Sequence, residues 1–188
     1  DVRRLFMEHM GGIFNCHVIG FDDLERMIVD EACSKKPVMD DTEKRVMLSG
    51  IINGLSSDNF FGLAKNRPGF INQAMNAIRL LKRSYITPEQ FFSKTSVCGG
   101  NLLKKCMSFY EIYSKYEGIK AKKGVMDVDD ISFEAVAKCH RASIFNGVKV
   151  IVIDGFVNVD PVNMELVRRI MEHFPHIEVH VNVPYRNV

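Results

Sequence analysis

Residues 149 to 161 read KVIVIDGFVNVDP, and this stretch predicts the fold of the chain around it. Residues 150 to 153 are consecutive β-branched residues, which is typical of a strand buried on both faces of a mainly parallel sheet. Asp154 follows directly, and ligands of open α/β sheets bind at the carboxyl ends of the strands. Asp154 is therefore well placed to hold a metal-bound phosphate; the alternative is a core strand followed by an ordinary turn aspartate. Pro161 predicts the first turn of a helix that ends near residue 174.

Two further segments predict strands of the same sheet. Residues 16 to 19 lie in the sequence NCHVIG and precede a helix that begins at Asp22. Residues 177 to 183 alternate between apolar and polar side chains and follow the helix that begins at Pro161. We expect strands near residues 16–19, 148–153 and 177–183 to form one parallel sheet, because each pair is joined through helical sequence.

The sequence between the first two predicted strands contains helical patterns. Thr87, Pro88 and Gln90 form a helix start, with a Thr cap, Pro at the first helical position and Gln three residues after the cap. A second helix is expected from about residue 100 to a stop at Gly118, and a short helix near residues 59–65. The simplest organisation is an α/β core made of residues 1–36 and 127–188, with an all-helical insertion at residues 37–126.

Tyrosines at every third position mark the helix after residue 100. Tyr110, Tyr113 and Tyr116 share roughly one helical face. Such a row either packs against neighbouring helices or stacks on nucleic-acid bases. We expect packing, because a buried aromatic stripe is the ordinary way in which a helix of this kind joins a core.

Composition excludes several classes of protein. The 188 residues carry a net charge of +2, so any basic surface for a polyanion must be local. No apolar run approaches the length of about eighteen residues that a membrane span requires, so no membrane contact is predicted. The five cysteines are widely spaced without a CxxC pair, which predicts reduced cytoplasmic thiols and neither a disulfide framework nor a metal site. They are Cys16, Cys33, Cys98, Cys106 and Cys139.

Five segments in order resemble a known family. They are HVIGFDDLERMI, NRPGFINQAMNAIRLLKRSYITPEQFF, FYEIYSKYE, MDVDDI and VIVIDGFVNVDPVNMELVRRI. Together they resemble the AddB (RexB) type subunit of bacterial ATP-dependent helicase-nucleases, which has a UvrD-like superfamily 1 helicase fold. The resemblance implies an internal N-terminal fragment: an incomplete, parallel-sheet RecA-like (P-loop NTPase-like) helicase core with a helical insertion. It also implies a larger cytoplasmic hydrolase for double-strand break repair and recombination, with ATP, Mg²⁺ and an iron–sulfur cluster, and with DNA and an AddA-type subunit as partners.

The resemblance assigns roles to single residues. Asp154 matches the magnesium-binding acid of the helicase DExx sequence, and Gly155 stands where the second, water-activating acid is expected. Gly20 and Phe21 match a segment that lies against single-stranded DNA in active helicases. MDVDDI matches the place where the chain returns from the insertion to the core. None of the cysteines matches the iron–sulfur ligands, which lie in a later part of that family's chain.

The glycine at position 155 argues against ATP hydrolysis by this chain. Hydrolysis depends on positioning the attacking water, and glycine has no group for that task. No GxxxxGK[ST] phosphate loop occurs in the sequence either. The leading hypothesis is a degenerate helicase-like scaffold for DNA and a partner, inactive alone. The alternatives are an active superfamily 1 ATPase domain, or a protein-interaction module without a ligand.

Contact with DNA is expected through basic residues of the insertion. Arg79, Lys82 and Arg83 end one predicted helix, and a group of lysines brackets the next. These lysines are Lys104, Lys105, Lys120, Lys122 and Lys123. Ordinary solvated surface is the alternative interpretation for each of these residues.

Overall fold

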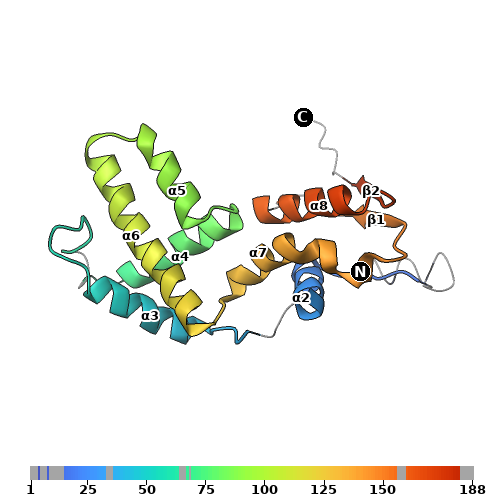
Figure 1. Cartoon of the computed structure of the whole chain (residues 1–188), viewed down its shortest axis with the longest axis horizontal. Coiled ribbons are helices and arrows are strands. Elements are labelled where there is room, and N and C mark those ends of the chain that lie inside the picture. Colours follow the sequence, from blue (N-terminus) through green and yellow to red (C-terminus); the bar gives the residue numbers. More distant parts are fainter. Residues whose placement is uncertain are drawn as a thin grey trace.

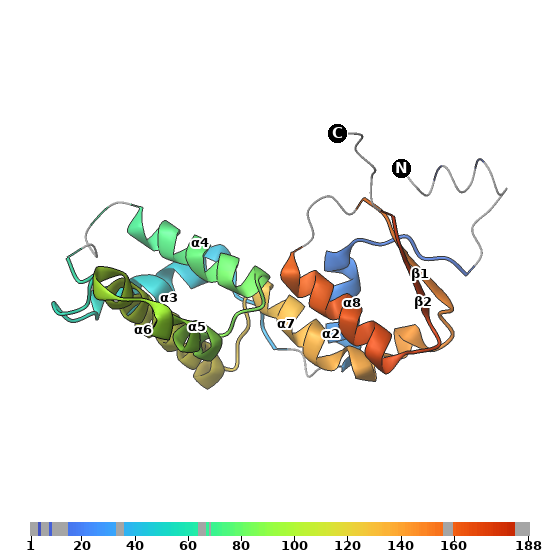
Figure 2. The same cartoon turned by 90° about the horizontal axis from the view of Figure 1, so that it is seen from above.

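The computed structural model describes residues 4, 8, 15–32, 36–63, 67, 69–155 and 160–182. Its elements form two lobes that lie side by side along the long axis (Figures 1 and 2). The helical lobe consists of α3 to α6, and the α/β lobe consists of α2, α7, α8, β1 and β2. Each lobe has its own cluster of buried apolar residues, so two cores stabilise the chain.

The α/β lobe is built on two parallel strands. β1 (Val150–Ile153) pairs with β2 (Glu178–Val181), and α8 (Pro161–His173) connects them as a crossover. The parallel pairing predicted for these two segments is therefore confirmed. The other elements of this lobe are α2 (Phe21–Ala32), α7 (Val128–Lys138) and two short 3₁₀ helices, Cys139–Arg141 and Ser143–Phe145. Leu166 and Ile170 of α8 pack with Ile28 and Val136 in the core of this lobe.

Two expectations about the sheet are wrong. Residues 16–19 form no strand in the described part of the chain, where the sheet has only β1 and β2. Three of these four side chains are exposed, as in β2, but no described strand pairs with the segment, so it lacks the hydrogen-bonded neighbouring strand that β2 has in β1. β1 is also not buried on both faces, since Val150 is 49% exposed and Val152 is 66% exposed. The described architecture is α/β and mostly helical, with a small parallel sheet.

The helical lobe begins and ends its helices at recognisable caps. Its elements are α3 (Asp41–Asn53), α4 (Phe70–Arg83), α5 (Pro88–Lys94), the 3₁₀ helix η1 (Thr95–Val97) and α6 (Gly100–Lys123). Thr87 and Gln90 form the predicted capping box before α5, and Asp40 with Glu43 forms another before α3. Ile52, Ile78 and Ile112 are fully buried in the core of this lobe.

The helix α6 does not stop at Gly118 as the sequence predicts. It continues to Lys123 and ends at Gly124, whose φ of 65° is the left-handed conformation of a C-terminal cap. A glycine inside a helix costs about 1 kcal/mol, but the buried face continues past it, so packing overrides that penalty. Tyr113 and Tyr116 are almost completely buried in the core of this lobe, and the half-buried Tyr110 packs on Phe92 of α5, which confirms that the tyrosines pack against neighbouring helices. In the described part of the range 59–65, where a short helix is expected, residues 59–63 form turns; residues 64 and 65 lie outside the described residues.

The chain passes between the lobes twice, and the two crossings lie side by side. The Met126 amide donates to the Pro37 carbonyl at 2.9 Å, and the Met39 amide donates to the Met126 carbonyl at 2.7 Å. Val38 and Met126 thus form a parallel bridge between the entering and leaving segments. Among the described helices, none combines the length and apolar character needed to span a membrane.

Candidate functional site

The carboxyl ends of β1 and β2 bring two polar side chains together. Asp154 follows β1, Asn182 follows β2, and the Asn182 side-chain amide donates to the Asp154 carboxylate at 2.7 Å. The Asn182 backbone amide donates to the Ile153 carbonyl at 2.8 Å, which holds the two strand ends in register. The structure therefore places Asp154 at the strand end where the sequence predicts it, with its carboxylate exposed and hydrogen-bonded.

The next residue cannot complete a nucleotide site. Gly155 has a φ of 77°, a conformation that glycine adopts freely and that strains other residues. A magnesium ion bound with a nucleotide takes one or two carboxylates together with the phosphate oxygens, and the phosphates need a cradle of amides with a lysine. The chain supplies Asp154 and no Gly-rich loop of that type, so its residues do not by themselves fit an ATP–Mg²⁺ site.

The basic end of α4 faces the α/β lobe and is not a free DNA-binding surface. Lys82 is 2% exposed, and its ammonium contacts the carboxylates of Asp127 and Asp130. This burial argues against the predicted contact between Lys82 and DNA. Arg83 lies 3.5 Å from the Asp160 carboxylate, and Arg79 lies 3.8 Å from that of Asp129, although both guanidinium groups remain about half exposed.

The other predicted DNA-contact positions lie at the start of α2. Gly20 is exposed, and its carbonyl accepts the first helical hydrogen bond from the Leu24 amide at 3.0 Å. Phe21 is partly buried and packs against the core of the α/β lobe. The Phe21 ring therefore has a structural contact of its own, while the Gly20 backbone stays accessible.

Lys82 belongs to a buried charge cluster at the junction of the lobes. One oxygen of Asp127 accepts three hydrogen bonds: from Lys82 at 2.8 Å, Lys120 at 3.0 Å and the Tyr116 hydroxyl at 2.7 Å. The other oxygen accepts from the Asp130 amide as the N-cap of α7. The buried charge cluster as a whole consists of Lys82, Tyr116, Glu117, Lys120, Asp127 and Asp130.

Opposite charges hold Asp127 and Lys82 of the buried charge cluster in their ionised forms. Burial alone would raise the pKa of Asp127, but the nearby ammonium groups of Lys82 and Lys120 hold that pKa well below its usual range. Burial would likewise lower the pKa of Lys82, yet the carboxylates of Asp130, Asp127 and Glu117 raise it well above its usual value. Burial and the charge of Asp127 raise the pKa of the Tyr116 hydroxyl, which therefore stays protonated and donates.

The buried charge cluster is a connection between lobes. Within the described residues, Glu117, Asp127 and Asp130 are the one group of potential metal ligands close enough to share an ion. Two ammonium groups already contact all three carboxylates, so lysine charge takes the place of a cation there. Lys82 and Lys120 come from the helical lobe, whereas Asp127 and Asp130 begin the α/β lobe.

The sequence contained a signal for this cluster. Lys82 stands four residues after the buried Ile78, and Lys120 stands four residues after the buried Tyr116. Residues four apart lie on the same helical face, so both lysines occupy buried faces. A lysine at such a position requires a carboxylate partner, and MDVDDI supplies the carboxylates.

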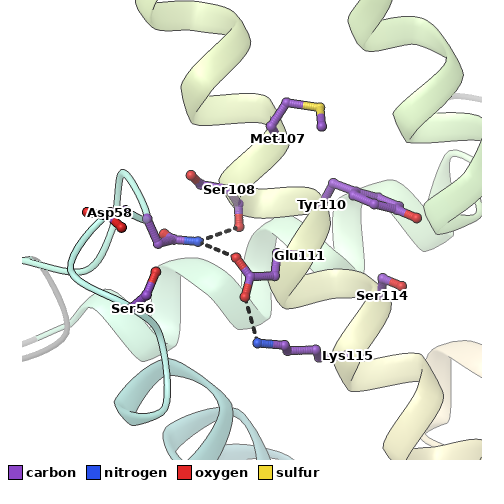
Figure 3. Close-up of a pocket in the computed structure, with 9 residues that line it drawn as sticks. Ser56, Asp58, Met107, Ser108, Tyr110, Glu111, Ser114 and Lys115 are labelled. Carbon is purple, nitrogen blue, oxygen red and sulfur yellow. Dashed lines mark hydrogen bonds and ion pairs between the residues drawn. The ribbon is translucent and has the colours of Figure 1, made fainter.

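A groove of about 580 Å³ lies between α6 and the turn that follows α3 (Figure 3). Its polar groups bond mainly to one another: Asn59 donates to Glu111 at 2.8 Å, and Lys115 donates to Glu111 at 2.6 Å. These two donors lower the pKa of Glu111, so the carboxylate stays charged and paired. The groove is lined by Ser56, Asp58, Asn59, Met107, Ser108, Tyr110, Glu111, Ser114 and Lys115. We assign no function to it.

Comparison with known proteins places the chain in a family. The sequence model of the family described as "ADDB, N-terminal" matches residues 3–187. The chain belongs to the AddB N-terminal family. A curated relative, the B-type ATP-dependent helicase/deoxyribonuclease subunit of Clostridium novyi (strain NT), is 23% identical over 180 residues. That alignment covers 94% of this chain and 16% of the relative, so the AddB-like sequence here spans a small part of the relative's length.

Proposed function

We propose that this chain is a catalytically degenerate, helicase-like part of an AddB-type subunit. In this role it acts as a scaffold that contacts DNA and a partner subunit of AddA type during double-strand break repair and recombination. The observation that carries the proposal is the end of β1, where Asp154 is present and Gly155 stands in the place of the water-activating acid. ATP, Mg²⁺ and an iron–sulfur cluster would then belong to other parts of the complex.

The geometry of the β1 edge supports the degenerate interpretation. Asp154 already accepts a hydrogen bond from Asn182, which a ligating carboxylate would have to share or give up. The positive φ at Gly155 disfavours any side chain there, so the backbone itself is unsuited to a catalytic glutamate. The two parallel strands are consistent with an edge of a larger RecA-like sheet completed by other segments of the polypeptide.

The family membership supports a role in a helicase-nuclease assembly. The Clostridium relative is named as a subunit, which motivates the proposal that this chain also works beside a partner protein. The buried charge cluster suits a scaffold, because it joins the helical lobe firmly to the α/β lobe.

ATP turnover tests the proposal. The purified 188-residue chain should hydrolyse no ATP above background, with or without single-stranded DNA. The variant Gly155→Glu should also remain inactive, because phosphate binding would still be lacking. Turnover that is lost on Asp154→Ala would contradict the proposal and favour the active superfamily 1 ATPase. Absence of both turnover and DNA binding would favour a protein-interaction module.

A further inference from the structure

The hairpin tip is formed by residues 92–105, at the end of α5, in η1 and in the first turns of α6 (Figure 1). It carries positive charge at three lysines. Lys94, Lys104 and Lys105 are all exposed. Among the described residues, none of these three lysines has an ion-pair partner. The sequence from residue 90 to residue 110 contains no aspartate or glutamate, so the tip has a net positive charge without local compensation.

Two of the three positive charges of the hairpin tip, at Lys104 and Lys105, have no evident structural use. Other lysines of this lobe do have one: Lys44, Lys82 and Lys120 are buried against carboxylates, and Lys115 pairs with Glu111. Lys104 and Lys105 lie near the start of α6 and gain nothing from the helix dipole, which favours acids at that end, whereas Lys94 lies in the last turn of α5, where the dipole favours a cation. We therefore infer that the lysines at the tip serve a binding partner that is negatively charged.

Apolar side chains lie among these lysines. Val97 is 89% exposed, Leu102 is 56% exposed and Phe92 is 45% exposed, and all three belong to the hairpin tip. The Phe92 ring also packs on Tyr110 with centroids 4.9 Å apart, which fixes its orientation on α5. A surface that combines free ammonium groups with exposed apolar and aromatic groups suits a ligand with phosphates and accessible bases.

We propose that the hairpin tip binds single-stranded DNA, with Lys94, Lys104 and Lys105 contacting the phosphodiester backbone. The inference rests on the proposed function and assigns its DNA contact to a named surface, away from the basic end of α4. Single strands fit better than duplex, because duplex DNA presents mainly its phosphates and leaves the apolar groups of the tip without a partner.

The helix α6 offers a matched control for this proposal. Lys104 and Lys105 are adjacent exposed lysines near its start, and Lys122 and Lys123 are adjacent exposed lysines at its end. The second pair lies near the lobe junction, close in the chain to the bridge that joins Met126 to Met39 next to Asp40 and Asp41. The variants Lys104→Gln/Lys105→Gln and Lys122→Gln/Lys123→Gln thus remove the same charge from the same helix at opposite ends.

The experiment measures the fluorescence anisotropy of a labelled oligo(dT) strand with the 188-residue chain at several salt concentrations. Lys104→Gln/Lys105→Gln should reduce the slope of log affinity against log salt by about 1.4, since each phosphate contact on a single strand contributes about 0.7. The control pair should leave the slope unchanged. A duplex of the same length should bind more weakly, and the thermal melts of both variants should match the parent.

The possible outcomes separate this inference from the proposed function. Two results with a chain that does bind oligo(dT) would overturn the assignment of DNA binding to the hairpin tip: both variants keep the parental slope, or only the control pair reduces it. Either result would leave the proposed DNA-contacting scaffold intact. If duplex binds as tightly as the single strand and both respond alike to the tip variant, the preference for single strands is overturned. If oligo(dT) does not bind even at low salt, the DNA role in the proposed function fails together with the tip.

Discussion

Replacing Lys82 with methionine should destabilise the chain strongly. Lys82→Met keeps a long apolar stem but removes one of two ammonium groups that face three carboxylates in the buried charge cluster. Removing one partner of a buried ion pair costs about 3 to 5 kcal/mol, because the remaining charge stays buried without compensation. Lys120 and Tyr116 still donate to Asp127 in the variant, so we expect the lower end, about 3 kcal/mol.

Equilibrium unfolding in urea, followed by far-ultraviolet circular dichroism, measures this loss. Lys123→Met provides the control, since Lys123 is an exposed lysine on the same helix as Lys120 and should change the free energy of unfolding by less than about 0.5 kcal/mol. The double variant Lys82→Met/Asp127→Asn removes a charge of each sign. It should be less destabilised than the sum of its single variants, because the two groups interact directly.

A loss below about 1 kcal/mol for Lys82→Met would refute the reasoning, because surface ion pairs contribute amounts of that size. Additive effects in the double variant would also contradict a direct pairing of Lys82 with Asp127. Either result would mean that water reaches the junction and screens the charges of the cluster.

Three further predictions concern titration and backbone conformation. The pKa of Asp127 is lowered in the folded chain, so its ionised carboxylate stabilises the fold above the unfolded-state pKa of about 3.9, and this stabilisation is lost as the pH falls below that value. In Asp127→Asn, the free energy of unfolding should therefore fall less steeply with decreasing pH in the acid range. Burial raises the pKa of Glu25, so Glu25→Gln should raise the melting temperature of the chain at pH 7, and the gain should vanish below about pH 4. Gly155→Ala should destabilise the chain by about 1 kcal/mol because of the positive φ at that position. Gly118→Ala inside α6 should stabilise the chain by about 0.5 to 1 kcal/mol, because alanine is the better helix residue. If urea unfolding shows that both variants change the free energy of unfolding in the same direction, the backbone argument is contradicted.

Local sequence signals predicted helices with clear start residues and strands rich in β-branched residues. The cap at Thr87 and the start of α8 at Pro161 follow from side chains next to the element itself. The parallel pairing of the strands at 150–153 and 178–181 follows from the order strand, helix, strand along the chain. Residues 16–19 form no strand because no described strand offers a pairing surface beside them, although β1 and β2 are equally short. Local rules cannot show whether such a surface exists.

Of the candidate site, too, sequence located one residue correctly and misjudged another. Asp154 could be placed from sequence, because its position depends only on the end of β1. The role of Lys82 could not be placed from the basic run Lys82-Arg83, because burial depends on the packing of α4 against α6 and α7. A run of basic residues at the end of a helix looks the same whether it faces solvent or a neighbouring lobe; only the spacing from Ile78 distinguished Lys82.

The most direct test of the degenerate scaffold is the affinity of the chain for oligo(dT) measured with and without saturating Mg²⁺·ATP. An active helicase domain links nucleotide binding to DNA affinity, because the two ligands favour different states of the domain. The account predicts the same dissociation constant under both conditions, since Gly155 and the absent phosphate loop leave no nucleotide site to couple. A change in affinity of about tenfold or more on adding Mg²⁺·ATP, abolished by Asp154→Ala, would contradict the account.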